Sequence, residues 1–208
     1  MPLSDAKLYA ADDSGILVKP HPDSHVERAD RLWFKSHHNF SINLKGSGLN
    51  ELSSRFKDNL ALQITNKRKE LGEDDLTELP DLFDFIKSET FRASTVAFCG
   101  PHILELNPTL AEDFWEFDSW LPLIFKKFPR WIIPRAFAIR DKMHSNIAKW
   151  HQYANANFDR DDQNQANLQW EPNFGARVMR AEWQMHQDAN VNISTAGRAA
   201  ADLGLIWA

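Results

Sequence analysis

Residues 139–154 have the sequence IRDKMHSNIAKWHQYA, and this stretch decides the fold class. Its apolar side chains recur at steps of four and three residues, at Ile139, Met143, Ile147, Trp150 and Ala154. Such steps bring side chains onto one face of an α-helix, which predicts a long helix with a buried side. No segment of the chain shows the apolar–polar alternation of a half-buried strand. The sequence therefore predicts an all-α fold.

Helical signals continue from this stretch toward the N-terminus. Pro80 and Asp81 are typical of a helix start, and Gly100 and Pro101 of a helix end. Glycine accepts a positive φ at the end of a helix, and proline cannot continue the hydrogen-bond ladder. We therefore expect a helix between these two pairs. A further helical face upstream consists of Leu49, Leu52, Phe56, Leu60 and Ile64.

The N-terminal part divides into two regions. Scattered glycines and prolines predict an irregular lead-in over residues 1–23. Ser24 and Glu27 have the spacing of a capping box, in which the two side chains satisfy free amides of the first helical turn. This pair predicts a helix from about Ser24 into the forties. We expect the helical domain to occupy residues 24–208.

Prolines and one serine set the expected boundaries in the second half. Pro122, Pro129 and Pro134 predict an irregular connector, because each lacks the amide proton that a helix interior needs. Ser194 is a suitable N-cap for a final alanine-rich helix that runs to Ala208.

Composition narrows the function classes. Aromatic residues make up 12% of the 208 residues, which favours a packed helical interior or a large apolar pocket. The net charge of −5 argues against nucleic acid as a partner, because phosphate binding needs a basic face. The first residues lack the pattern of a signal peptide, and we expect no membrane anchor in this chain.

The chain contains a single cysteine, Cys99. One thiol cannot form an internal disulfide, and it cannot supply a four-cysteine zinc or iron–sulfur site. Cys99 lies at the end of an expected helix, directly before Gly100, and no glycine-rich ligand loop precedes it. We therefore expect a buried packing residue at this position.

Six short segments resemble a known family in their order and spacing. They are RLWFKSHH at 31–38, LPDLFDFI at 79–86, FCGPH at 98–102, DFWEFD at 113–118, WEPNFG at 170–175 and ADLGLIWA at 201–208. Together they resemble the cytochrome P450 superfamily, in particular fungal members related to sterol 7- and 8-hydroxylases and prostacyclin synthase. The resemblance implies an internal fragment that extends from helix C to the start of helix I.

This resemblance implies haem-thiolate chemistry. Members of the family are oxidoreductases that use haem iron, O2 and electrons from an NADPH-dependent P450 reductase to oxidise a lipophilic small molecule. Full-length relatives are anchored in the endoplasmic reticulum membrane. In the family, a Glu-x-x-Arg pair and the iron-ligand cysteine loop follow the start of helix I, so we expect both to lie beyond Ala208. We therefore expect an incomplete P450-like helical domain without the haem-ligand segment, truncated and inactive alone, and we expect this chain alone to bind no haem.

The resemblance also implies candidate residues for haem. Related proteins carry Trp-x-x-x-Arg in helix C, where both side chains bind a haem propionate. Here Trp33 and His37 have the same spacing, one helical turn apart, and His38 is a second possible donor. The alternative interpretation is an amphipathic helix face in a chain that holds no haem.

Trp115, Phe117 and Trp120 are candidates for substrate binding. In the family this region forms the roof of the substrate pocket, whereas aromatics at helical spacing are also common in a plain core. We expect no metal site, because His21 and His25 are separated by Pro22 and no carboxylate completes a ligand set. The alternative function is a non-enzymatic helical binding or interaction protein that retains a P450 scaffold.

Overall fold

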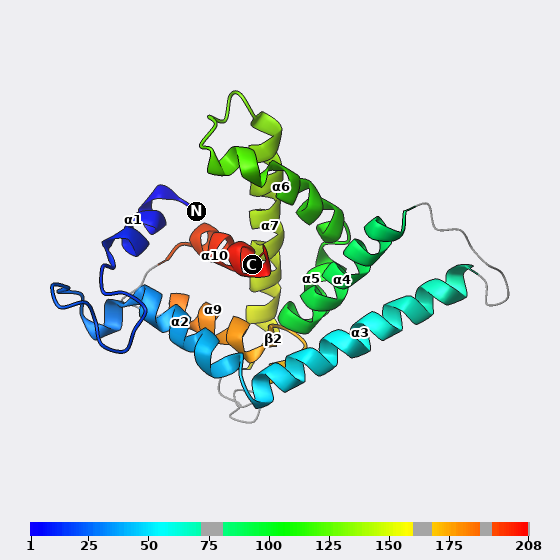
Figure 1. The fold of residues 1–208 in the computed structure, drawn as a ribbon, viewed down its shortest axis with the longest axis horizontal. Coiled ribbons are helices and arrows are strands. Elements are labelled where there is room, and N and C mark those ends of the chain that lie inside the picture. Colours follow the sequence, from blue (N-terminus) through cyan, green and yellow to red (C-terminus); the bar gives the residue numbers. More distant parts are fainter. Residues whose placement is uncertain (72–80, 160–167, 188–192, 208) are drawn as a thin grey trace.

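The computed structural model describes residues 1–71, 81–159, 168–187 and 193–207. This part of the chain is predominantly helical, with one two-stranded antiparallel sheet, so the predicted all-α fold class is confirmed (Figure 1). The elements are α1 (Leu3–Ala11), the 3-10 helix η1 (Arg28–Asp30), α2 (Leu32–Asn43), α3 (Ser47–Leu71), α4 (Leu82–Cys99), α5 (His102–Leu106), α6 (Leu110–Phe125), α7 (Pro134–Asn157), β1 (Trp170–Glu171), β2 (Gly175–Ala176), α9 (Arg177–Gln187) and α10 (Thr195–Trp207).

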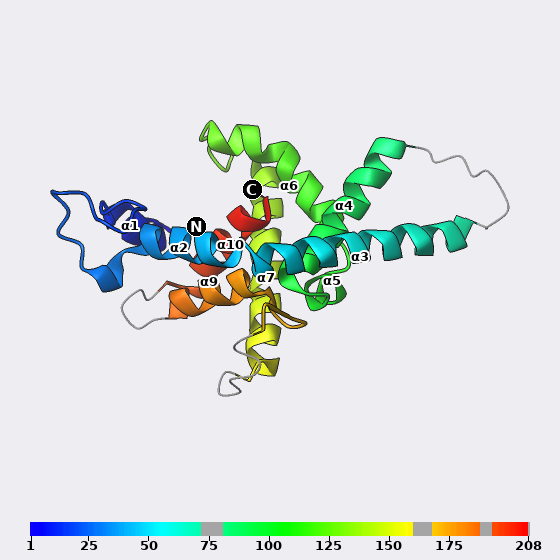
Figure 2. The ribbon, with the colours of Figure 1, turned by 60° about the horizontal axis from the view of Figure 1, so that its bottom comes forward.

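Helix α7 forms the centre of the molecule, and it contains the long helix that the spacing of residues 139–154 predicts. All five side chains of its predicted face are buried, and they belong to the main hydrophobic core. Helices α5, α6 and α10 pack on α7, and Figure 2 shows them grouped around it. The period of the apolar residues therefore predicted both the helix and its buried side.

Helices α3 and α4 pack against each other along much of their length and extend to one side of α7 (Figure 1). The start of α4 follows the predicted signal, because the Asp81 carboxylate accepts hydrogen bonds from the backbone N–H groups of Phe83 and Asp84. Its end also follows the prediction, since α4 stops at Cys99 and Gly100 has a φ of +80°.

The N-terminal expectations need two corrections. The lead-in at residues 1–23 is not irregular throughout, because Leu3–Ala11 form helix α1. Ser24 does not start a helix: its hydroxyl donates to Asp13 and accepts from the amide of Val26, and α2 begins only at Leu32. The hydroxyl is held by the preceding loop instead of a helical turn. The division between residues 23 and 24 stays a prediction.

Pro122 does not break the chain into a connector, which corrects a third expectation. Helix α6 passes through Pro122 and ends at Phe125. The proline lies in the last turn of α6. It removes one backbone hydrogen bond there, close to the end of the helix, where the regular hydrogen-bond pattern stops in any case. Leu121, buried one residue earlier, anchors this turn in the core. Pro134 does behave as predicted, because α7 begins there.

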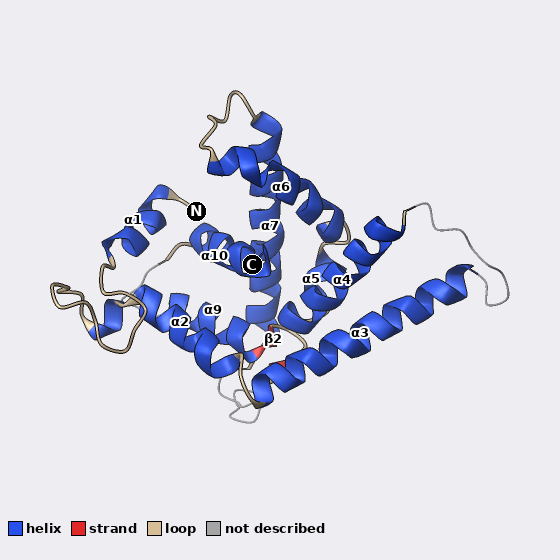
Figure 3. Cartoon of the chain, viewed as in Figure 1, coloured by secondary structure: helices blue, strands red, loops and turns tan. Residues whose placement is uncertain are grey.

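A small hairpin closes the C-terminal side of the core. Strands β1 and β2 pair antiparallel, with Trp170 opposite Ala176 and Glu171 opposite Gly175 (Figure 3). Gly175 has a φ of +73°, and a Cβ at this position would lie 2.3 Å from the carbonyl oxygen of Phe98. Only glycine therefore allows the hairpin to rest on the end of α4.

Candidate functional site

An apolar cavity lies between α4, α6 and the last turns of α10, and we name it the aromatic cavity. Its volume is about 660 Å³. The apolar side chains that line it are Phe83, Ile86, Phe91, Phe114, Trp115 and Ile206. Phe91 stacks on Phe114 with 4.3 Å between ring centroids, and Trp115 meets Phe114 edge to face at 5.1 Å. These ring contacts fix one wall of the cavity.

The three candidate substrate-binding residues occupy different places. Trp115 lines the aromatic cavity, and its buried indole N–H has no hydrogen-bond partner among the described residues. Phe117 is buried in the hydrophobic core, and Trp120 is partly buried against it. The structure therefore brings one of the three to the cavity, and a role in substrate binding stays a prediction for all three.

One cation, Lys87, stands at the aromatic cavity. Its ammonium nitrogen lies 4.5 Å from the ring centroid of Trp115, within the range of a cation–π interaction. The carboxylate of Asp84 is 3.9 Å away, at the limit of an ion pair. Asp118 adds a carboxylate to the lining, so the cavity combines aromatic walls with a few polar groups. This combination is typical of sites for small lipophilic ligands.

Trp33, His37 and His38 lie on α2, all exposed. The indole N–H of Trp33 donates to the carbonyl oxygen of Tyr9 at 2.9 Å, and His38 stacks on Phe34. An indole N–H and two imidazoles are donors that suit an acid group such as a haem propionate. The donor chemistry of these three side chains suits a haem propionate, but the Tyr9 carbonyl occupies the Trp33 N–H in this structure. A role in haem binding stays a prediction.

Cys99 does not suit iron. Its side chain is 0% exposed and belongs to the hydrophobic core. Burial, and to a smaller degree the charge of Asp202, raises the pKa of the thiol well above its usual range, so the thiolate that iron requires is disfavoured. Backbone atoms of the hairpin lie directly against the next residue, Gly100. The chain's one thiol is thus a packing group in this fold.

Sequence reasoning missed a group of buried and partly buried polar side chains between α1, α7, α9 and α10, which we name the polar cluster. Nε2 of His151 lies 2.6 Å from Oδ2 of Asp202, and both side chains are buried. The Tyr9 hydroxyl lies 2.7 Å from Nε2 of His186. The cluster consists of Tyr9, His151, Glu182, His186 and Asp202.

Glu182, a member of the polar cluster, has a carboxyl whose pKa lies close to neutral pH. Burial raises the pKa of its carboxyl from 4.5 to about 7, although hydrogen bonds from Asn39 and Ser36 oppose the rise. Both donors lie on α2, 2.9 Å from the carboxylate oxygens. The same burial lowers the pKa of His186 and keeps that ring neutral. Glu182 therefore joins α2 to α9 through a carboxyl that is easily protonated.

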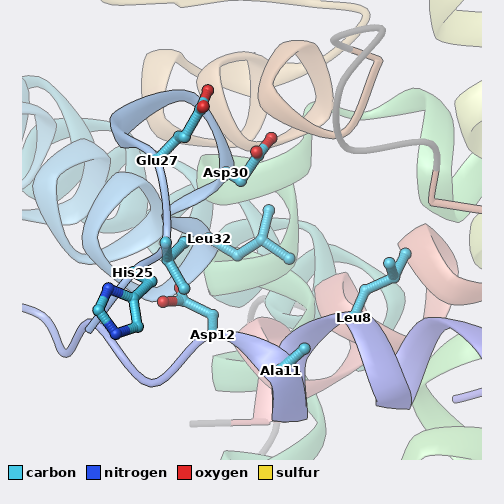
Figure 4. Close-up of a pocket in the computed structure, with 8 residues that line it drawn as sticks. Leu8, Ala11, Asp12, His25, Glu27, Asp30 and Leu32 are labelled. Carbon is cyan, nitrogen blue, oxygen red and sulfur yellow. The ribbon is translucent and has the colours of Figure 1, made fainter. Parts of the chain in front are cut away.

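A second cavity, of about 390 Å³, lies beside the C-terminal end of α1 (Figure 4). Leu8 and Leu32 give it an apolar side, and Asp12, Glu27 and Asp30 supply carboxylates. Burial alone would raise the pKa of Asp12, but hydrogen bonds to its carboxylate lower the pKa below its usual value.

Within the described residues, no three metal-binding side chains are grouped as a metal ion requires. Nor is any helix in that part of the chain long and apolar enough to cross a membrane.

A faint signal for the polar cluster is present in the sequence. His151 follows Trp150 on the buried side of α7, where a histidine needs a partner. Asp202 interrupts the apolar final helix in the same way. The sequence gives no reason to pair these two, because they are 51 residues apart.

Three curated proteins match most of the chain. It is 34% identical over 190 residues to the cytochrome P450 monooxygenase fsoE of Humicola fuscoatra, a match that covers 91% of this chain and 32% of the relative. It is 33% identical over 165 residues to efuG of Hormonema carpetanum, covering 79% of this chain and 29% of the relative. It is 32% identical over 174 residues to calL of Penicillium decumbens, covering 83% and 32%. Both of these are also named cytochrome P450 monooxygenases.

The chain spans about a third of the length of the curated relatives that it matches. No family model and no solved structure matches it. The three matches agree with the resemblance of the six sequence segments and with the helical fold. The chain belongs to the cytochrome P450 superfamily.

Proposed function

We propose that this chain supplies the substrate wall and the haem-flanking helix of a cytochrome P450 monooxygenase. The complete enzyme would oxidise a lipophilic compound with O2 and with electrons from an NADPH-dependent reductase. The names of the three relatives support this activity. Haem would supply the oxygen chemistry, while the protein binds and orients the substrate and excludes water.

The aromatic cavity is the observation that carries this proposal. Pockets for small molecules are typically about 300–1,000 Å³ and mostly apolar, with a few polar groups that orient the ligand. The cavity, at about 660 Å³, has this size and this lining. Trp115 would contact the substrate directly, whereas Phe117 and Trp120 would hold α6 in place from the core.

Helix α2 would bind the acid groups of the haem through Trp33, His37 and His38. Trp33 and His37 would each donate to a propionate, with His38 as the alternative donor. A protonated histidine makes a stronger, charge-assisted hydrogen bond than a neutral one. The buried Cys99 supplies no iron ligand in this proposal, and we infer that the chain by itself does not catalyse the oxidation.

The binding test uses a lipophilic fluorescent dye, Nile red, which a sterol then displaces. Thr90 lines the aromatic cavity, so Thr90→Trp fills it and should abolish dye binding and displacement. The matched control is Thr65→Trp, on the exposed surface of α3. Equal dye binding by both variants would place the ligand elsewhere and contradict the proposed substrate wall.

The haem test measures the reduced carbon-monoxide difference spectrum of the purified chain with added haemin. We expect no thiolate-type Soret band, and no change on Cys99→Ala. A thiolate band that disappears in Cys99→Ala would show that Cys99 binds iron and would overturn the inference that the chain is inactive alone. The second candidate function, a binding protein without catalysis, is favoured by the same buried thiol. This second function predicts that the chain binds the dye and releases it to a sterol, and that no substrate is oxidised when a P450 reductase is added.

A further inference from the structure

Helix α1 is attached to the molecule in an unusual way. Apart from Asp5, no residue of α1 is buried, and Leu3 and Leu8 are 75% and 41% exposed. A helix of nine residues has little stability of its own. Because apolar burial contributes so little, a few polar contacts must hold α1 in place.

Two of these contacts join α1 to the C-terminal helices. The Asp5 carboxylate accepts hydrogen bonds from the hydroxyl of Ser194, at 2.5 Å, and from its backbone N–H, at 3.2 Å. Ser194 in turn caps α10 by accepting from the amide of Gly197. A Cβ on Gly197 would lie 2.3 Å from Oδ2 of Asp5, so only glycine permits this approach.

The second contact is the hydrogen bond between Tyr9 and His186. Burial raises the pKa of the Tyr9 phenol and lowers the pKa of His186. The phenol therefore keeps its proton, and its oxygen shares a hydrogen bond of 2.7 Å with Nε2 of the neutral ring. This bond spans 177 residues of sequence and fixes the C-terminal end of α1 on α9.

On its other side α1 contacts Trp33. The Tyr9 carbonyl oxygen accepts the indole N–H of Trp33 at 2.9 Å, and the Tyr9 ring meets the indole edge to face at 5.1 Å. Beyond the end of α1, Asp12 accepts the backbone N–H of Trp33. Tyr9 thus links α9 to α2, and it uses the one polar atom of the indole.

We propose that α1 is a detachable strap: while it is docked, the Tyr9 carbonyl occupies the indole N–H of Trp33. A ligand with an acceptor group reaches that N–H only after α1 has moved away. This exclusion rests on the proposed function for the identity of the ligand, a haem propionate. The detachment itself does not depend on any ligand.

The strap is tested by limited trypsin digestion of the full chain. Lys7 lies on α1, and cleavage there requires the helix to leave its seat and unwind. Tyr9→Phe removes one hydrogen bond, worth about 1 kcal/mol, so cleavage at Lys7 should become about fivefold faster. The rate is measured by mass spectrometry relative to cleavage at exposed Lys45. The matched control is Tyr153→Phe, which deletes the hydroxyl of the chain's other tyrosine.

The outcomes separate the strap from the haem proposal. A selective rise at Lys7 in Tyr9→Phe supports the strap. An unchanged rate overturns it, because the Tyr9 hydroxyl would then not hold α1 in place. An equal rise at every site also overturns it, because α1 would then open only with the whole fold. Haemin titration, followed by Soret absorbance, forms a separate arm: the wild-type chain should bind little or no haemin, Tyr9→Phe should bind more, and Trp33→Phe should remove that gain. Failure of haemin binding in every variant would contradict the proposed role of Trp33, His37 and His38 in haem binding. It would not affect the conclusion drawn from the digestion.

Discussion

The aromatic cavity and the polar cluster are built by opposite means. The cavity is lined mainly by residues of α4 and α6. Within each of these helices the lining residues lie close together in the sequence. The polar cluster takes members from α1, α7, α9 and α10, and its contacts join residues up to 177 positions apart. Apolar contacts add up without direction, whereas buried polar groups need individual partners. Substitutions in the cavity wall should therefore lower stability in proportion to the apolar contacts removed, whereas removal of one partner in the cluster should leave a buried polar group unpaired.

Loss of one ring from the cavity wall is expected to have a large effect. Phe114 is buried and contacts both Phe91 and Trp115. Phe114→Ala should lower the free energy of unfolding by about 4 kcal/mol, because a core cavity replaces the ring. Chemical denaturation measures this loss. The control is Phe83→Ala, whose exposed ring should cost far less; equal losses would mean that the stack does not support the wall.

Removal of one partner from the polar cluster should cost a similar amount through a different mechanism. Asp202→Ala leaves His151 buried without its partner, which should lower the free energy of unfolding by about 3 kcal/mol. The double variant with His151→Leu and Asp202→Leu should recover much of this loss, since neither polar group remains. Asp58→Ala, on exposed α3, is the control. A double variant as unstable as Asp202→Ala would show that the pair itself stabilises the fold.

The pH dependence of stability separates the two regions further. The pKa of Glu182 is about 7 in the folded chain and 4.5 in the unfolded one, so only the unfolded chain ionises between these values. Stability should therefore fall as pH rises from about 4.5 to 7, by up to about 3 kcal/mol from this group. Glu182→Gln should flatten that part of the curve, whereas Glu112→Gln, an exposed residue, should not. Parallel curves for wild type and Glu182→Gln would contradict the raised pKa.

The smallest effect is expected at the rim of the aromatic cavity. Lys87→Gln removes the cation from the face of Trp115 and should cost about 1 kcal/mol or less, because the site is partly solvated. Lys87→Arg should retain the stability, since a guanidinium also stacks on an indole. A loss above 2 kcal/mol in Lys87→Gln would mean that the rim is held as tightly as the polar cluster.

Much of the fold was predictable because local rules decided it. The Asp81 cap, the Gly100 stop and the buried face of α7 each depend on residues within a few positions of one another. The predictions failed where a distant contact competed. Ser24 bonds to Asp13 instead of capping a helix, and Pro122 stays inside α6 because the surrounding side chains are anchored in the core.

The candidate site was predictable only in part for the same reason. Aromatic spacing and family resemblance led to α2 and α6, but only the packing separates Trp115, at the cavity, from Phe117, in the core. The sequence by itself determined the helical class, the long helix with its buried face over residues 139–154, and the family of this protein. Tertiary structure alone decided the pairing of His151 with Asp202 and the docking of α1 on Trp33. Helical period is a property of neighbouring residues, whereas the partner of a buried polar group is set by the way distant segments meet.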